Sequence, residues 1–204
     1  RKSFLEPQRL PDFVPDGEGP LIVIIGGSQG ALGLNRMVRI VLPLLLDKGC
    51  RVVHLIGSKE KENSVICHKN LVSKKFSNEM PGLLQHADLA ISRAGAGTIS
   101  ELAVSGTPAI LVPYPASSDN HQSSNAAYAA QYGAAVIVHE NTSNEQFLSE
   151  TLLRLLNNKL MKKNKSTDLL NIMKKGMESL AVKEASQNVL FALTNLISEC
   201  NSSL

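Results

Sequence analysis

The sequence contains no tryptophan, and aromatic residues make up only 4% of its 204 residues. With so few rings for base stacking and a net charge of only +3, a nucleic-acid partner is not expected. The three cysteines, Cys50, Cys67 and Cys200, stand far apart and form no CxxC pair. This pattern indicates a reducing compartment and favours neither a disulfide framework nor a zinc site.

Long apolar runs are also missing. The longest, residues 40–46, has seven residues and contains Pro43, whereas a transmembrane helix needs roughly 18. The chain opens on Arg1 with no signal-peptide hydrophobic region behind it, so we expect a piece of a longer protein. No histidines stand at HxxxH or HxxE spacing, so no metal site is expected. GxGxxG and GxxxxGK[ST] are absent as well, which argues against a dinucleotide cofactor or a P-loop.

The residues that are present predict a folded α/β domain. Hydrophobic residues make up 43% of the chain and charged residues 19%, so a substantial core is expected. Short β-branched runs alternate with amphipathic segments, which predicts a doubly wound, Rossmann-like parallel sheet. We expect strands at 21–25, 51–56, 71–75, 89–92, 109–112 and 135–138. We expect helices near 31–48, with a kink at Pro43, and near 59–69, 80–87, 97–106, 122–132, 144–157 and 181–198.

Composition divides the chain into three parts. Residues 1–20 are rich in proline and glycine and are predicted as a linker; residues 21–157 form the Rossmann-like domain, and 158–204 add C-terminal helices to it. Between 159 and 175, six lysines face only Asp168. They form either a solvated helical pair or a surface attracted to anionic membrane, at roughly 1 kcal/mol per lysine. The last helix is expected to pack on the domain or on a missing partner half.

Ligands of open α/β sheets bind beyond the carboxyl ends of the strands, and three segments fall there. The first is residues 26–31 (GGSQGA), which follow the first strand and open a helix. Glycines allow a close backbone approach, the unpaired N–H groups of a helix start favour an anion, and Ser28 could donate to a phosphate oxygen. The alternative is a tight turn without a ligand.

The second segment is residues 92–101 (SRAGAGTISE), after the fourth strand. Gly95 and Gly97 open a helix, where a diphosphate would gain hydrogen bonds of about 1.5–3 kcal/mol each. Glu101 lies one turn further, where its carboxylate could accept from both hydroxyls of a ribose. The alternative is a capping box, in which Thr98 and Glu101 only satisfy donors of the helix start.

The third segment, residues 113–126, is a polar loop that enters a helix after the fifth strand. Asp119, His121, Gln122 and Asn125 provide donors and acceptors suited to sugar hydroxyls. The alternative is an Asp or Asn cap with a solvated first turn.

Four motifs in this order, GGSQGA, SRAGAGTISEL, GTPAILVPYP and DNHQSSNA, resemble the C-terminal half of the MurG family of GT-B glycosyltransferases over most of residues 1–157. That family moves GlcNAc from UDP-GlcNAc to lipid I, undecaprenyl-diphospho-muramoyl-pentapeptide, and so forms lipid II. The resemblance implies a role in peptidoglycan synthesis, and through it in cell shape and division. It also implies a cytoplasmic, peripheral place on the inner face of the plasma membrane.

The resemblance also implies residue roles. Ser28 would contact the diphosphate, the helix-start amides 96–98 would support it, and Glu101 would bind the ribose. Gln122 would hold the GlcNAc, and the backbone at 76–77 would read the uracil edge. The family usually has a larger apolar residue where this chain has Ser77, so only the backbone role carries over there. The full implied UDP-GlcNAc set is Arg1, Ser28, Phe76, Ser77, Gly95, Ala96, Gly97, Thr98, Ile99, Ser100, Glu101, His121, Gln122 and Asn125.

The implied reaction is a direct, inverting displacement at the anomeric carbon, with UDP as leaving group. In the family, the N-terminal half supplies the acceptor groove and the general base, so this chain alone is expected to be inactive. Two alternatives remain: a donor-binding subunit of a split dolichol-diphosphate GlcNAc transferase, and one half of a UDP-GlcNAc 2-epimerase.

Overall fold

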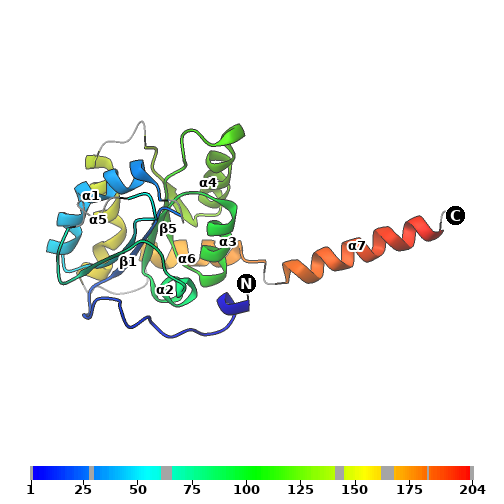
Figure 1. Cartoon of the computed structure of the whole chain (residues 1–204), viewed down its shortest axis with the longest axis horizontal. Coiled ribbons are helices and arrows are strands. Elements are labelled where there is room, and N and C mark those ends of the chain that lie inside the picture. Colours follow the sequence, from blue (N-terminus) through cyan, green and yellow to red (C-terminus); the bar gives the residue numbers. More distant parts are fainter. Residues whose placement is uncertain are drawn as a thin grey trace.

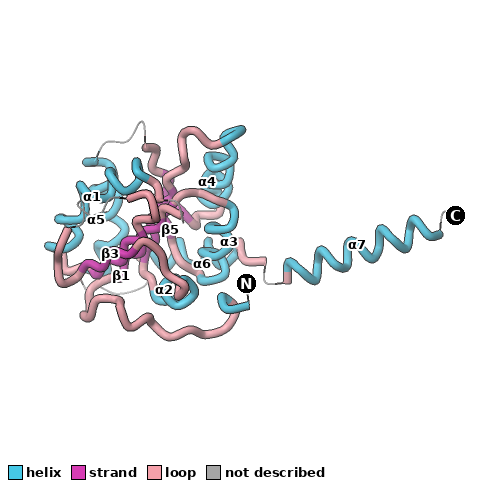
Figure 2. Tube along the Cα trace, in the orientation of Figure 1, coloured by secondary structure: helices cyan, strands magenta, loops and turns pink. Residues whose placement is uncertain are grey.

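The computed structural model describes residues 2–27, 30–60, 66–140, 145–161, 168–182 and 184–202. All six of its strands run parallel in one sheet, in the order β3-β2-β1-β4-β5-β6. The strands lie inside the domain with helices around them (Figure 2). The strands are β1 (Leu21–Ile25), β2 (Arg51–Leu55), β3 (Leu71–Lys74), β4 (Leu89–Ser92), β5 (Ala109–Leu111) and β6 (Ala135–Ile137). The predicted fold class is confirmed, and each strand ends within one residue of its expected bound.

The helices mostly lie where the sequence predicts them. They are α1 (Leu32–Asp47), α2 (Met80–His86), α3 (Ala96–Ser105), α4 (His121–Gln131), α5 (Glu145–Leu160), α6 (Leu169–Ser179) and α7 (Ala185–Ser202), with 3₁₀ turns η1 (Lys2–Phe4) and η3 (Ser118–Asn120). α1 continues across the exposed Pro43, and the expected kink stays a prediction. The helix expected at 59–69 is wrong in its described part, because residues 59–60 form a turn and 66–68 are irregular; residues 61–65 lie outside the described chain.

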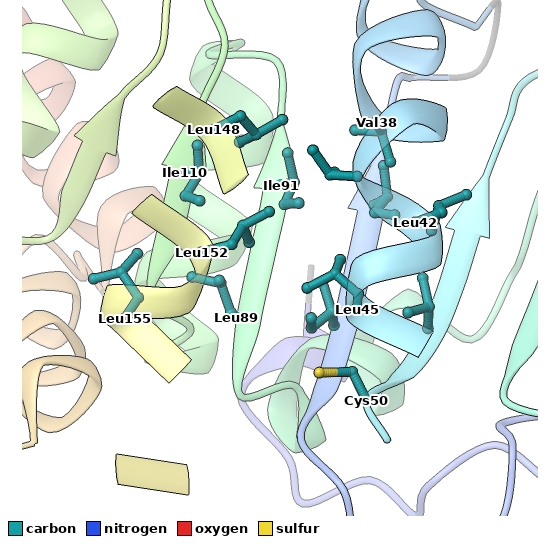
Figure 3. Packing of buried hydrophobic residues seen from close by; sticks show 14 of the residues in the cluster. Val38, Leu42, Leu45, Cys50, Leu89, Ile91, Ile110, Leu148, Leu152 and Leu155 are labelled. Carbon is teal, nitrogen blue, oxygen red and sulfur yellow. The ribbon is translucent and has the colours of Figure 1, made fainter. Parts of the chain in front are cut away.

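Helices cover both faces of the sheet. On one face, Val38, Leu42 and Leu45 of α1 and Leu152 of α5 pack with apolar strand residues such as Ile91 (Figure 3). The other face packs against α2, α3 and α4, through a second set of buried residues that includes Leu83, Leu84, Leu102, Ala126 and Ala129. Because parallel strands are buried on both faces, their sequences are continuously apolar rather than alternating.

The N-terminal segment lies against the domain. Phe4 and Val14 are buried in the cluster that α2 and α3 share. The Gln85 side chain of α2 fixes the segment, because its Oε1 accepts from the Gln8 N–H (2.8 Å) and its Nε2 donates to the Phe4 carbonyl (3.2 Å). Residues 5–20 hold no strand or helix, as a linker would, but they are anchored to α2.

The two C-terminal helices differ. α6 belongs to the domain: Leu170 and Met173 join one core cluster and Met177 joins the other. α7 extends away from the domain (Figure 1), and its Val189, Leu190 and Phe191 are exposed. The expectation that the last helix packs on its own domain is therefore wrong in this structure, because other helices already cover both faces of the sheet. Packing on another part of a longer protein stays a prediction.

Candidate functional site

At the carboxyl edge of the sheet, the connections that follow β1 and β4 lead to opposite faces. β1 and β4 are paired there, with Ile25 opposite Ser92, and the Arg93 N–H donates to the Ile25 carbonyl (3.4 Å). From these adjacent strand ends, α1 leads to one face of the sheet and α3 to the other. Such a switch point leaves a crevice between the two connections, which is where open α/β sheets bind ligands.

An open cavity of about 440 Å³ lies at this edge. Gly26 and Gly30 of the β1–α1 turn line one side, together with Gly33 in the first turn of α1. Side chains that follow β2, β4, β5 and β6 complete it, four from loops and Gln122 from α4: Lys59, Arg93, Tyr114, Gln122 and Glu140. The volume suits a small molecule, since ligand pockets span roughly 300–1,000 Å³. Two cationic side chains against one carboxylate favour an anionic ligand.

The β1–α1 turn depends on glycine. Gly27 and Gly30 have φ angles of +87° and +86°, a region that other residues rarely adopt, and the Gly30 N–H donates to the Gly27 carbonyl (3.0 Å). A Cβ at Gly30 would lie 2.7 Å from the Ile56 carbonyl oxygen. α1 begins after Ala31, which provides no side-chain cap. The described part of the turn therefore requires glycine at residues 27 and 30. Ser28 lies outside the described residues.

A buried polar network holds the turn's neighbouring loop. The Asn35 side chain of α1 donates to the Ile56 carbonyl (2.9 Å) and to the Glu60 carboxylate (2.6 Å), and its Oδ1 accepts from His54 Nε2 (3.0 Å). Burial and the nearby Arg39 lower the pKa of His54 from 6.5 to about 4, so the ring is neutral at physiological pH. The network fixes residues 56–60, and with them Lys59 at the cavity.

The second glycine-rich segment begins α3 without a capping box. Gly95, with extended backbone (φ −68°, ψ 141°), is the N-cap and makes no side-chain cap bond, so α3 already starts at Ala96. Thr98 is then the third helical residue, and the capping-box alternative for Thr98 and Glu101 is wrong. Ala96 and Gly97 are exposed, and nothing lies within 4 Å of a Cβ built on Gly97. The start of this helix is accessible to a ligand.

Arg93 connects the loops after three strands. Its Nη1 donates to the carbonyls of Val112 (3.2 Å) and Pro113 (3.3 Å), which follow β5. Its Nη2 lies 2.6 Å from Oε2 of Glu140, which follows β6; the contact is an ion pair rather than an aligned hydrogen bond. The guanidinium also lies over the Tyr114 ring, 5.3 Å from its centre. Arg93, which is only 9% exposed, thus connects the loops after β4, β5 and β6.

Gln122 and Asn125 of α4 contact the same loops. Gln122 Oε1 accepts from the N–H groups of Ala94 (3.2 Å) and Tyr114 (3.0 Å), and Asn125 Nδ2 donates to the Ala94 carbonyl (3.0 Å). Asn120 caps α4 with a left-handed backbone and no side-chain bond, so the alternative of an Asp or Asn side-chain cap is wrong. Gln122 lines the cavity, whereas His121 lies exposed at the start of α4.

The remaining predicted residues are not all brought to this cavity. Ser100 and Glu101 line a separate cavity of about 250 Å³, together with Phe4 and Val104. Neither the amides of residues 96–98 nor Ile99 is among the described residues that line the 440 Å³ cavity. Phe76 is 59% exposed after β3, and the buried Ser77 Oγ accepts from the Glu79 N–H (3.1 Å). Arg1 lies outside the described residues.

Sequence reasoning missed three side chains of the cavity. Arg93 was read only as part of a glycine-rich motif, and neither Lys59 nor Glu140 was singled out. All three follow the ends of strands, β4, β2 and β6, so the rule that such loops converge could have identified them. Among the described residues, no group of three or more His, Cys, Asp or Glu side chains could hold a metal ion. None of the described helices is long and apolar enough to cross a bilayer.

Comparison with known proteins defines the class. Residues 21–181 match the model of the glycosyltransferase family 28 C-terminal domain, so the chain belongs to that family. It is also similar to a named enzyme, UDP-N-acetylglucosamine–N-acetylmuramyl-(pentapeptide) pyrophosphoryl-undecaprenol N-acetylglucosamine transferase. Identity is 56% over 197 residues with that of Prochlorococcus marinus MIT 9303 and 57% over 198 residues with that of strain SARG.

The fold comparison agrees. The crystal structure of Acinetobacter baumannii MurG superposes with a TM-score of 0.74 at 28% identity, over 94% of this chain and 55% of that one. The two Prochlorococcus marinus matches cover 97% of this chain and 55% of each relative. The resemblance to MurG that the motifs predict is confirmed, and the chain spans about half the length of the relatives it matches.

Proposed function

We propose that this chain is the donor-binding half of an inverting glycosyltransferase that moves GlcNAc from UDP-GlcNAc to lipid I, forming lipid II in peptidoglycan synthesis. The observation that carries the proposal is the cavity at the β1–β4 switch point, lined by a glycine-rich turn, Lys59 and Arg93. The names of the relatives at 56–57% identity point to this donor and acceptor.

The diphosphate belongs near the helix starts. Gly26 and residues 30–33 line the cavity, and the accessible start of α3 follows the neighbouring strand. Unpaired N–H groups at helix starts bind anions, and Lys59 adds a positive charge. As UDP leaves, negative charge grows on the diphosphate, and preorganised donors at this place stabilise the transition state. Ser28 adds a hydroxyl to this set.

The sugar and the nucleoside are assigned to the flanking segments. Gln122 Oε1 already accepts two backbone N–H groups, so its side-chain NH₂ is the group that would donate to GlcNAc hydroxyls, with His121 and Asn125 beside it. Glu101 would accept from the ribose, and the backbone at Phe76–Ser77 would meet the uracil. Because Ser100 and Glu101 line another cavity, this assignment requires the nucleoside to extend past the start of α3.

The chemistry needs a second half. The 4-hydroxyl of the muramoyl sugar attacks the anomeric carbon of the donor with inversion, and a general base takes the hydroxyl proton. That base and the lipid acceptor groove are assigned to a part of the protein outside this chain. The whole enzyme would work at the cytoplasmic face of the plasma membrane, where its acceptor lies, and serve cell shape and division. Lysines such as Lys174 and Lys175, exposed on α6, would add attraction to an anionic surface.

Titration with UDP-GlcNAc, UDP and NADH tests the proposal. We expect saturable binding of both uridine ligands, none of NADH, and no turnover of a lipid I analogue by this chain alone. Glu101→Ala should weaken uridine binding by about 1–3 kcal/mol if it meets the ribose. Glu150→Ala, on the exposed side of α5, is the matched control and should leave affinity unchanged.

Each alternative predicts a different outcome. A UDP-GlcNAc 2-epimerase half would belong to a full-length enzyme that converts UDP-GlcNAc without any acceptor. A donor-binding subunit of a split dolichol-diphosphate transferase would give turnover only with a dolichol-linked acceptor. Failure of the chain to bind UDP-GlcNAc would refute all three readings.

A further inference from the structure

Among the described residues that line the cavity, Glu140 is the acidic one, and it belongs to none of the motifs identified in the sequence. Its Oε2 lies 2.6 Å from Arg93 Nη2, and its side chain is 22% exposed. Its Oε1 contacts the backbone of Gly33 in the first turn of α1, at a place that any Cβ on residue 33 would occupy. One carboxylate therefore touches both the first turn of α1 and the arginine that joins the loops after β4, β5 and β6.

We propose that Glu140 is a positioning residue for the diphosphate end of the donor cavity: by pairing with Arg93 and packing over Gly33, it fixes the β4–α3 and β5–α4 loops against the start of α1. The inference rests on the proposed function.

The Glu140–Arg93 pair holds a charged side chain that in turn positions the loop after β5. Arg93 also donates to the Val112 and Pro113 carbonyls, and the N–H of Tyr114, the next residue, donates to Gln122. A shift of the guanidinium therefore moves the backbone that Gln122 holds. Arg93 is nearly buried, so loss of its carboxylate partner leaves a positive charge poorly compensated. The side chain would then move toward solvent, into the cavity that the ligand needs.

A substitution at Gly33 tests the Glu140–Arg93 pair from a second position. Alanine is a better helix former than glycine, so Gly33→Ala should strengthen α1 itself. The added Cβ would nevertheless overlap the Glu140 carboxylate and push it from Arg93. A substitution that favours the helix should thus impair the cavity, and it should do so by the same route as removal of the Glu140 charge.

The experiment compares three ligands on Glu140→Gln, which keeps the side-chain shape and removes the charge. We expect the Kd for UDP-GlcNAc and UDP to rise about tenfold, and the Kd for uridine, which lacks phosphate, to stay within twofold. Gly33→Ala should give the same pattern, and the double variant should be no weaker than the worse single one. Lys159→Gln is the control and should change none of the three Kd values. It breaks the 2.8 Å pair between Lys159 on α5 and Asp88, the residue before β4.

Equal losses for all three ligands would overturn the inference, because they mean a general loss of structure. Tighter UDP binding by Glu140→Gln would also overturn it, because it means that the carboxylate merely competes with phosphate. An unchanged Kd in both variants would overturn it as well. A wild-type chain that binds no UDP-GlcNAc refutes the proposed function instead, so the two failures are distinct. If Glu140→Gln does not fold, Gly33→Ala carries the test.

Discussion

Asn35→Ala should be among the more destabilising single changes in this chain. Asn35 is fully buried in α1 and makes three hydrogen bonds: to the Ile56 carbonyl, to the Glu60 carboxylate and from the His54 ring. A neutral hydrogen bond contributes about 1 kcal/mol and one to a charged group about 1.5–3 kcal/mol. Together they place the loss in the free energy of unfolding at about 3–5 kcal/mol.

Urea unfolding followed by circular dichroism measures this loss. We expect the midpoint to fall while the slope m stays constant, because the surface exposed on unfolding hardly changes. Arg36→Ala, at the exposed neighbouring position of the same helix, is the matched control and should shift the free energy by less than about 0.5 kcal/mol. If Asn35→Ala costs no more than this control, the buried network does not hold the loop at 56–60, and the reasoning fails.

Two further predictions concern titratable groups. The folded pKa of His54, about 4, lies below its usual 6.5, so its share of stability is complete above pH 6.5 and is lost as the pH falls toward 4, by up to about 3 kcal/mol. His54→Gln should flatten the pH dependence of the unfolding free energy over that window; an unchanged slope contradicts the prediction. In a Cys200→Ser background, the exposed Cys67 should react with a disulfide reagent within minutes, whereas burial raises the pKa of Cys50 to about 11 and should protect it until unfolding. Two fast thiols would show that Cys50 is accessible.

The fold could be predicted because the buried strands are apolar along their whole length, and this pattern can be recognised in the sequence. Leu21–Ile25 and Leu89–Ser92 are short, apolar and bounded by glycine, proline or polar residues, so their ends were placed closely. The helix predicted at 59–69 is wrong in its described part because the residues after β2 form a loop, in which Asn35 holds Glu60 and Lys59 lines the cavity. Local pattern does not report such a long-range hydrogen bond.

The site was predicted only in outline. The glycine-rich turns after β1 and β4 can be recognised in the sequence, because glycine at a strand end permits backbone conformations and close approaches that other residues do not. Which side chains close the cavity depends on loops that are far apart in the chain: Arg93 and Glu140 are separated by 47 positions, and neither belongs to a spacing motif with the other. The same limit explains Glu101, whose place one turn into α3 turns it toward a different cavity.

We propose that the start of α1 and the loop after β4 bind the diphosphate of a uridine sugar. Mapping backbone amide shifts by NMR during a UDP-GlcNAc titration tests it most directly. Saturable shifts should concentrate at residues 26–33 and 93–98, with smaller ones at Gln122 and Asn125. Shifts confined to the opposite edge of the sheet, around Asp88 and Lys159, or no saturable shifts at all, would contradict the claim.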